Sequence, residues 1–462
     1  MMIQKEGLLW VGVARVGRRN NRRGKSMKRR KWYVLLAMVF VSVALVACTD
    51  DDPEDPGCST CGSNNPSSEP FSSPIPTEWT KVDWTDHYPD FTYKDLSPSC
   101  THCPMEDCES QFYFFAKGGA TDNLLVYFEG GGACWQTLNC IYESTTNTRV
   151  KARVDTVAGN DGIGDFDNED NPFKDWNIVY IPYCTGDVHA GAKDYDYPDD
   201  LGFHLLPDFN HWTIRHRGKV NFRVVLQWMQ DTFSGAPDKL FVTGSSAGAY
   251  GALLNFPDLR DAYPSSTAYC LPDAGNGIMP DNDALFKDPA QEQWNIQLPW
   301  QVEGFVEGTN DFTDFTSGEM VAMIANHYPD TIMAPYTAAW DHNQIFFYWA
   351  MLHLHYSLVL FGVDYWEGVD DTAVEWNLKM YDIVRDALDN STEGNTRYYV
   401  SPGCNHTIMG SPKFYEEVTE GYTMAGWITQ MLGTGLAGLP NVDCMPDCDA
   451  KPDYPSEGES CD

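Results

Sequence analysis

The chain has 462 residues, of which 43% are hydrophobic and 13% aromatic, so it can bury a large core in one to three domains. Its formal net charge is −35, but residues 1–47 carry 11 basic residues and one acidic residue, which leaves 20 basic against 65 acidic residues in the remainder. Such a negative field repels phosphate backbones, so we expect no nucleic-acid partner and favour neutral or cationic ones.

A basic cluster, an apolar run and small residues follow one another over residues 27–48, which is the layout of an export signal. The apolar run, residues 32–47, is shorter than the about 20 residues of a membrane-spanning helix, although an uncleaved anchor is the alternative. The run ends in Leu-Val-Ala-Cys48, which resembles the lipobox of bacterial lipoproteins. That resemblance implies lipidation at Cys48 and a cell-envelope lipoprotein, exported and either membrane-anchored or surface-exposed. Residues 1–47 are then an N-terminal extension and signal peptide.

Fourteen cysteines in an exported protein favour disulfides over free thiols. Cys134 and Cys140 are close enough in sequence for a local bridge. The spacing of Cys58 and Cys61, and of the cysteines within residues 100–108, also suits zinc, but no second pair with a partner histidine follows. Structural disulfides are therefore the favoured interpretation. Their connectivity stays open, and we expect no metal and no cofactor.

Three parts follow the predicted signal peptide. Residues 48–78 are rich in Asp, Pro, Ser and Gly and bury too little apolar area to offset the entropy cost of ordering, so they are predicted to form a disordered tether. Residues 79–440 form the predicted globular domain. Residues 441–462 are a polar, Pro-rich and Cys-containing C-terminal tail.

Short apolar runs alternate with helical patterns in the predicted domain. Residues 124–128 and 177–181 are candidate buried strands, and residues 219–233 place apolar side chains along one helical face. Residues 239–243 and 249–255 are typical of a strand and a helix on either side of a glycine turn. This alternation predicts an α/β fold with a parallel-sheet core covered by helices.

Residues 336–362 are rich in aromatic residues and have a helical pattern. A transmembrane helix is excluded here because an aspartate and three histidines interrupt the run. We expect a helical insertion near residues 295–370 that shapes a pocket beside the active site.

The sequence Gly244-Ser245-Ser246-Ala247-Gly248 has the pattern G-x-S-x-G, in which a serine is exposed on a strained turn between a strand and a helix. The glycines avoid clashes in this turn, and the helix N-terminus favours developing negative charge. Ser246 is therefore the candidate nucleophile, and a glycine-rich turn without chemical use is the alternative.

A nucleophilic serine needs backbone amides that bind the oxyanion of the tetrahedral intermediate. The amide of Ala247, directly after the serine, is the first candidate donor. The second is Gly131 or Gly132, because the sequence FEGGGACW follows a hydrophobic strand and its glycines allow a close approach to a carbonyl. An ordinary flexible turn is the alternative.

The general base is expected to be a histidine late in the chain, and eleven histidines compete for this role. His406 follows an apparent strand at residues 397–400 and has the right context. The acid that orients it falls between Ser246 and His406, and both Asp273 and Asp341 are candidates. The residue pattern leaves this choice open.

An ordered set of motifs over residues 110–410 resembles the pectin acetylesterase and Notum carboxylesterase family. The motifs are FEGGGACW, EDNPF, WNIVYIPYCTGDVHAG, RHRG, GSSAGAYG, DAGNG and WDHNQ. The resemblance implies an α/β-hydrolase-like fold, a Ser-Asp-His triad and ester hydrolysis.

Carried over by motif, this resemblance implies the catalytic residues Ser246, Asp341 and His406, and a structural role for Asp273. One departure is that Cys404 lies two residues before the histidine, where the family has a cysteine three residues before it.

These observations together predict an exported serine ester hydrolase whose hydrolase domain spans residues 79–440. The resemblance implies removal of acetyl groups from O-acetylated polysaccharide, so the expected partners are an acylated carbohydrate or another ester, and the membrane through Cys48. The alternatives are an esterase for longer acyl chains and a non-catalytic surface lipoprotein that binds a glycan or a partner.

Overall fold

The fold is described from a computed structural model. It describes residues 70–101, 111–135, 140, 146–147, 150–154, 159–198, 211–280, 290–353, 369–448 and 451. The predicted signal peptide, the predicted lipidation site Cys48 and most of the predicted tether lie outside the described residues.

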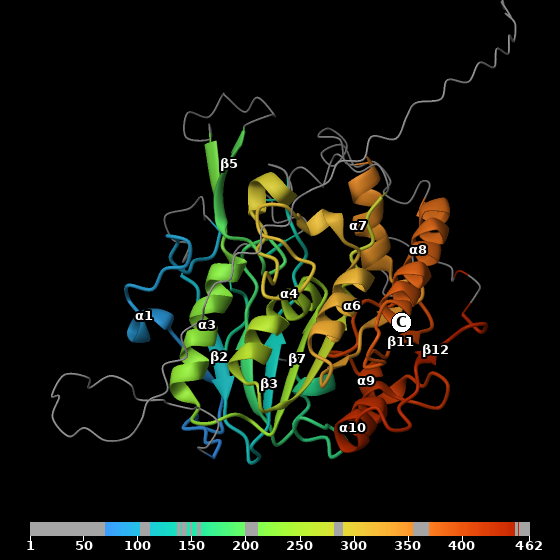
Figure 1. Cartoon of the computed structure of the whole chain (residues 1–462), viewed down its shortest axis with the longest axis horizontal. Coiled ribbons are helices and arrows are strands. Elements are labelled where there is room, and N and C mark those ends of the chain that lie inside the picture. Colours follow the sequence, from blue (N-terminus) through green and yellow to red (C-terminus); the bar gives the residue numbers. More distant parts are fainter. Residues whose placement is uncertain are drawn as a thin grey trace, which may run out of the picture. The chain divides into compact units, whose positions relative to one another are not determined.

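A mixed sheet of ten strands forms the centre of the described part of the chain (Figure 1). The strand order is β1-β2-β4-β3-β7-β8-β10-β11-β12, with β9 paired to β8. Strands β1 and β2 are antiparallel to their neighbours, and all pairs from β4 to β12 are parallel. The strands are β1 (Thr80–Val82), β2 (Phe114–Lys117), β3 (Leu124–Phe128), β4 (Asn177–Ile181), β7 (Lys239–Ser245), β8 (Thr267–Asp273), β9 (Ile332–Met333), β10 (Tyr336–Ala338), β11 (Tyr399–Ser401) and β12 (Val442–Asp443).

Helices cover both faces of this sheet. The helical segments are α1 (Trp84–His87), η1 (Gly162–Gly164), α3 (Gly218–Thr232), α4 (Ala247–Ala262), η2 (Ala290–Trp294), η3 (Phe312–Asp314), α6 (Ser317–His327), α7 (His342–His353), α8 (Val369–Asp389), α9 (Lys413–Glu416) and α10 (Met424–Thr434). The predicted α/β fold class is therefore confirmed.

Alternation along the strands explains why two layers of helices form. In β3, Val126 faces the core that contains α3, α4, α6, α7 and α8, whereas Leu125 faces the core that contains α9 and α10. In β7, Leu240 and Phe241 divide in the same way. Because successive strand residues point to opposite faces, a continuous apolar run is buried on both sides, as in central parallel strands.

A separate antiparallel hairpin, β5 (Lys193–Pro198) paired with β6 (His211–His216), projects from the body (Figure 1). Arg217 closes its base by donating two hydrogen bonds to the carboxylate of Asp194.

Among the described residues, none of the helices combines the length and apolar character that a membrane crossing requires.

Two segments differ from the sequence-based expectation. The region predicted as a helical insertion, near residues 295–370, also contains β9 and β10, because residues Tyr336–Ala338 pair with Tyr399–Ser401 in the main sheet. The sheet also continues beyond residue 440, since β12 pairs with β11. These three strands are only two or three residues long, which is too short for a periodic pattern to stand out.

Candidate active site

Ser246 lies in a tight turn between β7 and α4 with φ 58° and ψ −120°, a backbone conformation that costs energy for a residue with a side chain. The turn approaches β3 closely. A Cβ atom on Gly244 would lie 2.6 Å from the carbonyl oxygen of Phe128, and one on Gly248 only 2.0 Å from it. Both glycines are therefore needed for steric reasons, as the pattern G-x-S-x-G predicts. The amide of Ser246 donates to the carbonyl of Asp273 at 2.8 Å.

The glycine loop after β3 lies beside this turn. A Cβ atom on Gly130 would lie 3.2 Å from the Cβ of Ser246. Gly132 and Ala247 line the same pocket as Ser246, whereas Gly131 is not among the lining residues. A Cβ atom on Gly131 would lie 2.6 Å from the Asn147 side chain. Of the two candidate glycines, Gly132 is the one on the pocket side.

Two residues that the sequence reasoning missed hold this loop. His189 places Nε2 2.8 Å from the carbonyl oxygen of Glu129, and burial lowers the pKa of His189 to about 4, so the imidazole is neutral and donates. Burial raises the pKa of Glu129 to about 7, although the amide of Tyr183 donates to its carboxylate at 2.8 Å. The motif GDVHAG, directly after a predicted strand end, was the available signal for His189.

Asp341 and His406 lie together in the structure. His406 Nδ1 is 2.8 Å from Oδ2 and 2.9 Å from Oδ1 of Asp341. The Asp341 side chain is fully buried, while 14% of the His406 side chain is exposed. Burial opposes protonation of the imidazole, but the charge and hydrogen bond of Asp341, with a smaller contribution from Asp273, raise the pKa of His406 above its ordinary value.

Gln344 completes the surroundings of Asp341. Its backbone amide donates to Oδ1 of Asp341 at 3.0 Å, and its side-chain Nε2 donates to Oδ2 at 2.9 Å. Its Oε1 accepts from the amide of Asn276 at 3.0 Å. The motif WDHNQ thus places an acid and the amide side chain that holds it one helical turn apart at the start of α7.

Asp273 is the other acid that the residue pattern left open as the partner of the histidine. It does not lie at Nδ1 of His406, where Asp341 is bound instead. Its fully buried carboxylate accepts from Ser245 Oγ at 2.6 Å and from the amides of Ile408 and Met409 at 3.0 and 3.1 Å. Burial raises the pKa of Asp273 to about 6.

Ser246 and His406 open into one pocket whose empty volume, including its mouth, is about 700 Å³. Its walls are mainly aromatic and aliphatic, and none of the described residues that line it is a Lys, Arg, Asp or Glu. The lining residues are Gly132, Ala133, Trp135, Val188, Ser246, Ala247, Tyr250, Ala274, Gly277, Ile278, Met279, Trp294, Phe312, Gln344, Phe347, Met351, Trp376 and His406. Helices α7 and α8 contribute one side of this wall through Phe347, Met351 and Trp376.

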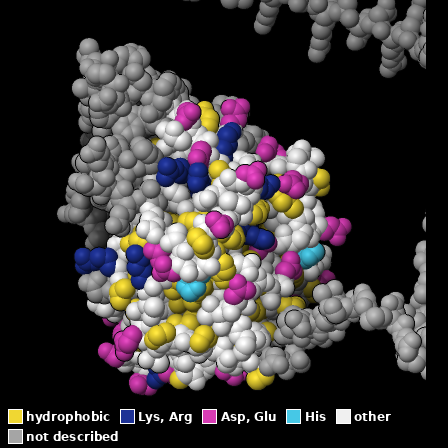
Figure 2. All heavy atoms as spheres, turned by 90° about the vertical axis from the view of Figure 1, so that its left-hand side faces the viewer, with side chains coloured by type: hydrophobic (Ala, Val, Ile, Leu, Met, Phe, Trp, Pro, Cys, Tyr) yellow, Lys and Arg dark blue, Asp and Glu magenta, His cyan; other side chains and the backbone are white. Residues whose placement is uncertain are grey.

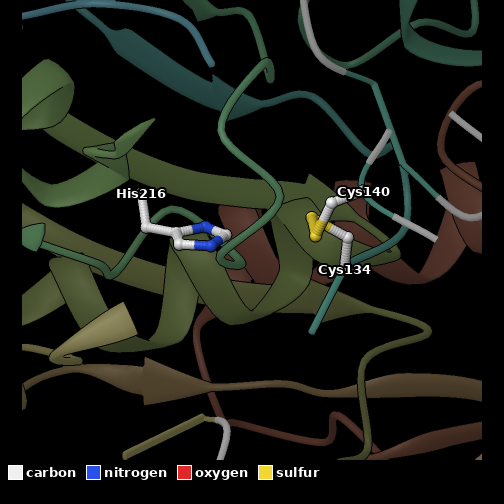
Figure 3. A group of neighbouring side chains, drawn as sticks. All are labelled: Cys134, Cys140 and His216. Carbon is white, nitrogen blue, oxygen red and sulfur yellow. A yellow bond between two sulfur atoms is a disulfide. The ribbon is translucent and has the colours of Figure 1, made fainter. Parts of the chain in front are cut away.

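A possible metal-binding group lies nearby, formed by Cys134, Cys140 and His216 (Figure 3). Its ligand atoms are already engaged. The two cysteines form a disulfide, which confirms the predicted local bridge. His216 Nδ1 is 2.9 Å from the carbonyl oxygen of Thr185, and Nε2 is 2.8 Å from the hydroxyl of Tyr197. This group is therefore a structural disulfide beside a histidine whose two ring nitrogens are both hydrogen-bonded.

Two further disulfides, Cys100–Cys184 and Cys444–Cys448, occur in the described part of the chain. The first joins residues 84 positions apart, and the second closes a short loop. Disulfides at several sites agree with an oxidising compartment, and hence with export.

Comparison with known proteins shows which family a part of this chain resembles. The sequence model of the pectinacetylesterase family matches residues 103–294. The resemblance to this family is thus confirmed. The palmitoleoyl-protein carboxylesterase NOTUM of Mus musculus is 27% identical over 172 residues, which cover 35% of this chain and 31% of the relative. Pectin acetylesterase 4 of Arabidopsis thaliana is 25% identical over 167 residues, which cover 35% of this chain and 38% of the relative.

The segment that matches the family model contains only some of the candidate site residues. The chain spans about a third of the length of these curated relatives. Ser246, Ala247 and Gly132 lie within residues 103–294, whereas Asp341 and His406 follow that segment.

Proposed function

We propose that the protein is an exported serine carboxylic-ester hydrolase in which Ser246, His406 and Asp341 act as the triad. The observation that carries the proposal is the 2.8 Å contact between His406 Nδ1 and the buried carboxylate of Asp341, in a pocket that His406 shares with Ser246. The strained backbone of Ser246 gives further support, because such strain concentrates at functional sites.

The reaction proceeds in two steps. Ser246 Oγ attacks the ester carbonyl carbon while its proton passes to His406 Nε2, and Asp341 at Nδ1 fixes the tautomer and stabilises the imidazolium. The amide of Ala247 and that of Gly132, or of Gly131 as the alternative, stabilise the oxyanion. The alcohol leaves with the proton from His406. Water, deprotonated by His406, then attacks the acyl carbon, and the acid leaves as His406 returns the proton to Ser246 Oγ.

Two acyl groups compete as substrate. Similarity to proteins named pectin acetylesterases supports an acetyl ester on a polysaccharide. The pocket supports a longer acyl chain, because its aromatic and aliphatic walls offer more apolar contact area than an acetyl methyl group can use. The NOTUM relatives carry the name of a carboxylesterase for a long acyl group.

The test is hydrolysis of 4-nitrophenyl esters from acetate to decanoate by the full-length protein, beside Ser246→Ala. We expect the variant to lose at least about 10⁴-fold in kcat/KM. Equal rates for both proteins would favour the non-catalytic binding protein instead. A kcat/KM that rises from acetate to the longer esters selects the longer acyl group, and a fall selects acetyl.

Export and lipidation at Cys48 form the second part of the proposal. Disulfides such as Cys100–Cys184 support export. Mass spectrometry of the N-terminal peptide from membrane fractions tests the anchor: a diacylated or triacylated Cys48 is expected, and an unmodified Cys48 with release of the protein into the soluble fraction would contradict it.

On the face that carries α1 and α3, Asp and Glu side chains are scattered among Lys and Arg (Figure 2). The described residues of the pocket lining carry no Lys, Arg, Asp or Glu, which supports a neutral acyl group as the part of the substrate that enters the pocket.

A further inference from the structure

Asp273 ends β8 at a junction between the two parts of the site. Its carbonyl oxygen accepts from the amide of Ser246 at 2.8 Å. Its carboxylate accepts from Ser245 Oγ, one residue before the candidate nucleophile, at 2.6 Å. A single buried residue therefore holds the serine turn through both its backbone and its side chain.

The same carboxylate holds the histidine loop. The amides of Ile408 and Met409 donate to it at 3.0 and 3.1 Å. Thr407, between these residues and His406, has φ 61°, a left-handed conformation that turns successive amides toward one anion. Residues 402–407 form neither helix nor strand, so the loop depends on such contacts for its position.

Asp273 does not act on the substrate directly. It does not line the pocket, and Asp341 occupies the Nδ1 side of His406. Its distance along the chain from the amides that it binds, 135 and 136 residues, means that these hydrogen bonds form only when the fold is complete.

We propose that Asp273 is a positioning residue whose ionised carboxylate ties the Ser246 turn to the His406 loop and stabilises the imidazolium of His406. This inference rests on the proposed ester hydrolase function.

The charged and titratable groups around Asp273 come from three elements. Tyr127 of β3 reaches it through Ser245, with the Tyr127 hydroxyl 2.8 Å from Ser245 Oγ. Tyr336 of β10 and His406 of the loop interact with its charge. Both tyrosines have pKa values above the ordinary value because of burial, so they stay neutral and His406 is the group that senses the charge of Asp273.

The sign of the effect on His406 follows. A negative Asp273 favours the imidazolium and contributes to the raised pKa of His406. Since the reaction needs a neutral His406 to accept a proton, activity rises with pH through this pKa. Removal of the Asp273 charge should therefore move the acid limb of kcat/KM to lower pH while the maximal rate falls.

The experiment measures kcat, KM and the pH profile of kcat/KM for the wild type, Asp273→Asn and Asp187→Asn with a 4-nitrophenyl ester. Asp187 is the matched control, because it is equally buried, has its pKa raised to about 6 by burial and accepts from Thr185 Oγ1 and the amide of Gly218, without a charge interaction with His406. In Asp273→Asn we expect a kcat about tenfold lower or more, an unchanged KM, and an acid limb shifted down by roughly half a pH unit or more.

An unshifted acid limb with wild-type kcat in Asp273→Asn would overturn the proposal, and so would an equal shift in Asp187→Asn. If Asp273→Asn does not fold, Ser245→Ala decides, because it removes the Oγ donor through which the Asp273 carboxylate holds the serine turn: a lower kcat with an unchanged KM supports the proposal, and a wild-type kcat contradicts it. The variant Ser246→Ala distinguishes a failure of the proposed function from a failure of this inference. Activity retained in Ser246→Ala ends the proposed function, whereas loss there with an unchanged Asp273→Asn ends only this inference.

Discussion

Ser246 and its glycine loop come from residues 128–135 and 244–248, which follow the adjacent central strands β3 and β7. Asp341 and His406 instead follow β10 and β11, two short strands close to the edge of the sheet that β12 forms. The first region is held by close backbone packing, in which a Cβ atom has no room, and by the contacts of its serine turn with Asp273. The second is held by hydrogen bonds to buried carboxylates.

This difference teaches how each region should respond to change. A turn that depends on steric fit is sensitive to a single added methyl group, because interiors are close-packed and backbone atoms cannot move aside at low cost. A loop that depends on buried carboxylates is sensitive to loss of charge in a side chain of unchanged shape. The predictions below separate these two kinds of sensitivity.

The largest effect is expected for Asp341→Asn, which keeps the shape of the side chain but removes the charge beside His406 Nδ1. The amide offers a donor where an acceptor is needed and so favours the wrong tautomer, and kcat should fall about 10³–10⁴-fold. Steady-state kinetics checks this, with Asp194→Asn at the base of the β5–β6 hairpin as control. A loss below tenfold would remove Asp341 from the triad.

Gly248→Ala should disturb the Ser246 turn, which depends on close steric fit. The new Cβ would lie 2.0 Å from the carbonyl oxygen of Phe128, so the turn must shift, and we expect a kcat at least about 100-fold lower and a loss of about 1–3 kcal/mol in unfolding free energy. Gly433→Ala is the control, since its Cβ meets no atom within 4 Å in α10. Wild-type kcat in Gly248→Ala would contradict the steric explanation.

A smaller effect is expected for Gln344→Met, which keeps the volume of the pocket wall but removes the Nε2 donor to Asp341. Loss of one hydrogen bond to a charged group corresponds to about tenfold in kcat. Because Asp341 itself remains charged, the pH profile should still show the raised pKa of His406. Kinetics between pH 5 and 9 tests this, and a loss as large as that of Asp341→Asn would show that Gln344 does more than hold the acid.

The smallest effect on kcat is expected from the disulfides, which differ mainly in stability. Removal of Cys100–Cys184, which closes a loop of 84 residues, should lower the unfolding free energy by about 4–5 kcal/mol and leave kcat unchanged in the folded protein. Removal of Cys134–Cys140, with a separation of 6, should cost about 2 kcal/mol but lower kcat a few-fold, because Ala133 and Trp135 line the pocket. Thermal unfolding and kinetics of the two double serine variants compare them, and the reverse order would contradict this assignment.

Much of the fold was predictable because its signals are local. The buried runs at residues 124–128 and 177–181 became β3 and β4 within their predicted bounds, and α3 differs by one residue at each end from the predicted helix at residues 219–233. The strands β1, β2, β5, β6, β9, β10 and β12 were not predicted. For β9, β10 and β12 the reason is length, since a strand of two or three residues carries no usable period and exists only because a neighbour is already in place.

The sequence by itself indicated the serine turn, because its tight strand-to-helix geometry has room only for glycine at positions 244 and 248, where a Cβ atom would clash with the carbonyl oxygen of Phe128. Its pattern also carried the family resemblance and placed the nucleophile candidate within it. The residue pattern left Asp273 and Asp341 open, since both follow short apolar segments in the chain, and the family resemblance favoured Asp341. Only the tertiary structure places a carboxylate beside the imidazole, and it is that of Asp341. The deciding contacts join residues 65 to 136 positions apart, and local patterns cannot encode a distance that the packing of the whole sheet sets.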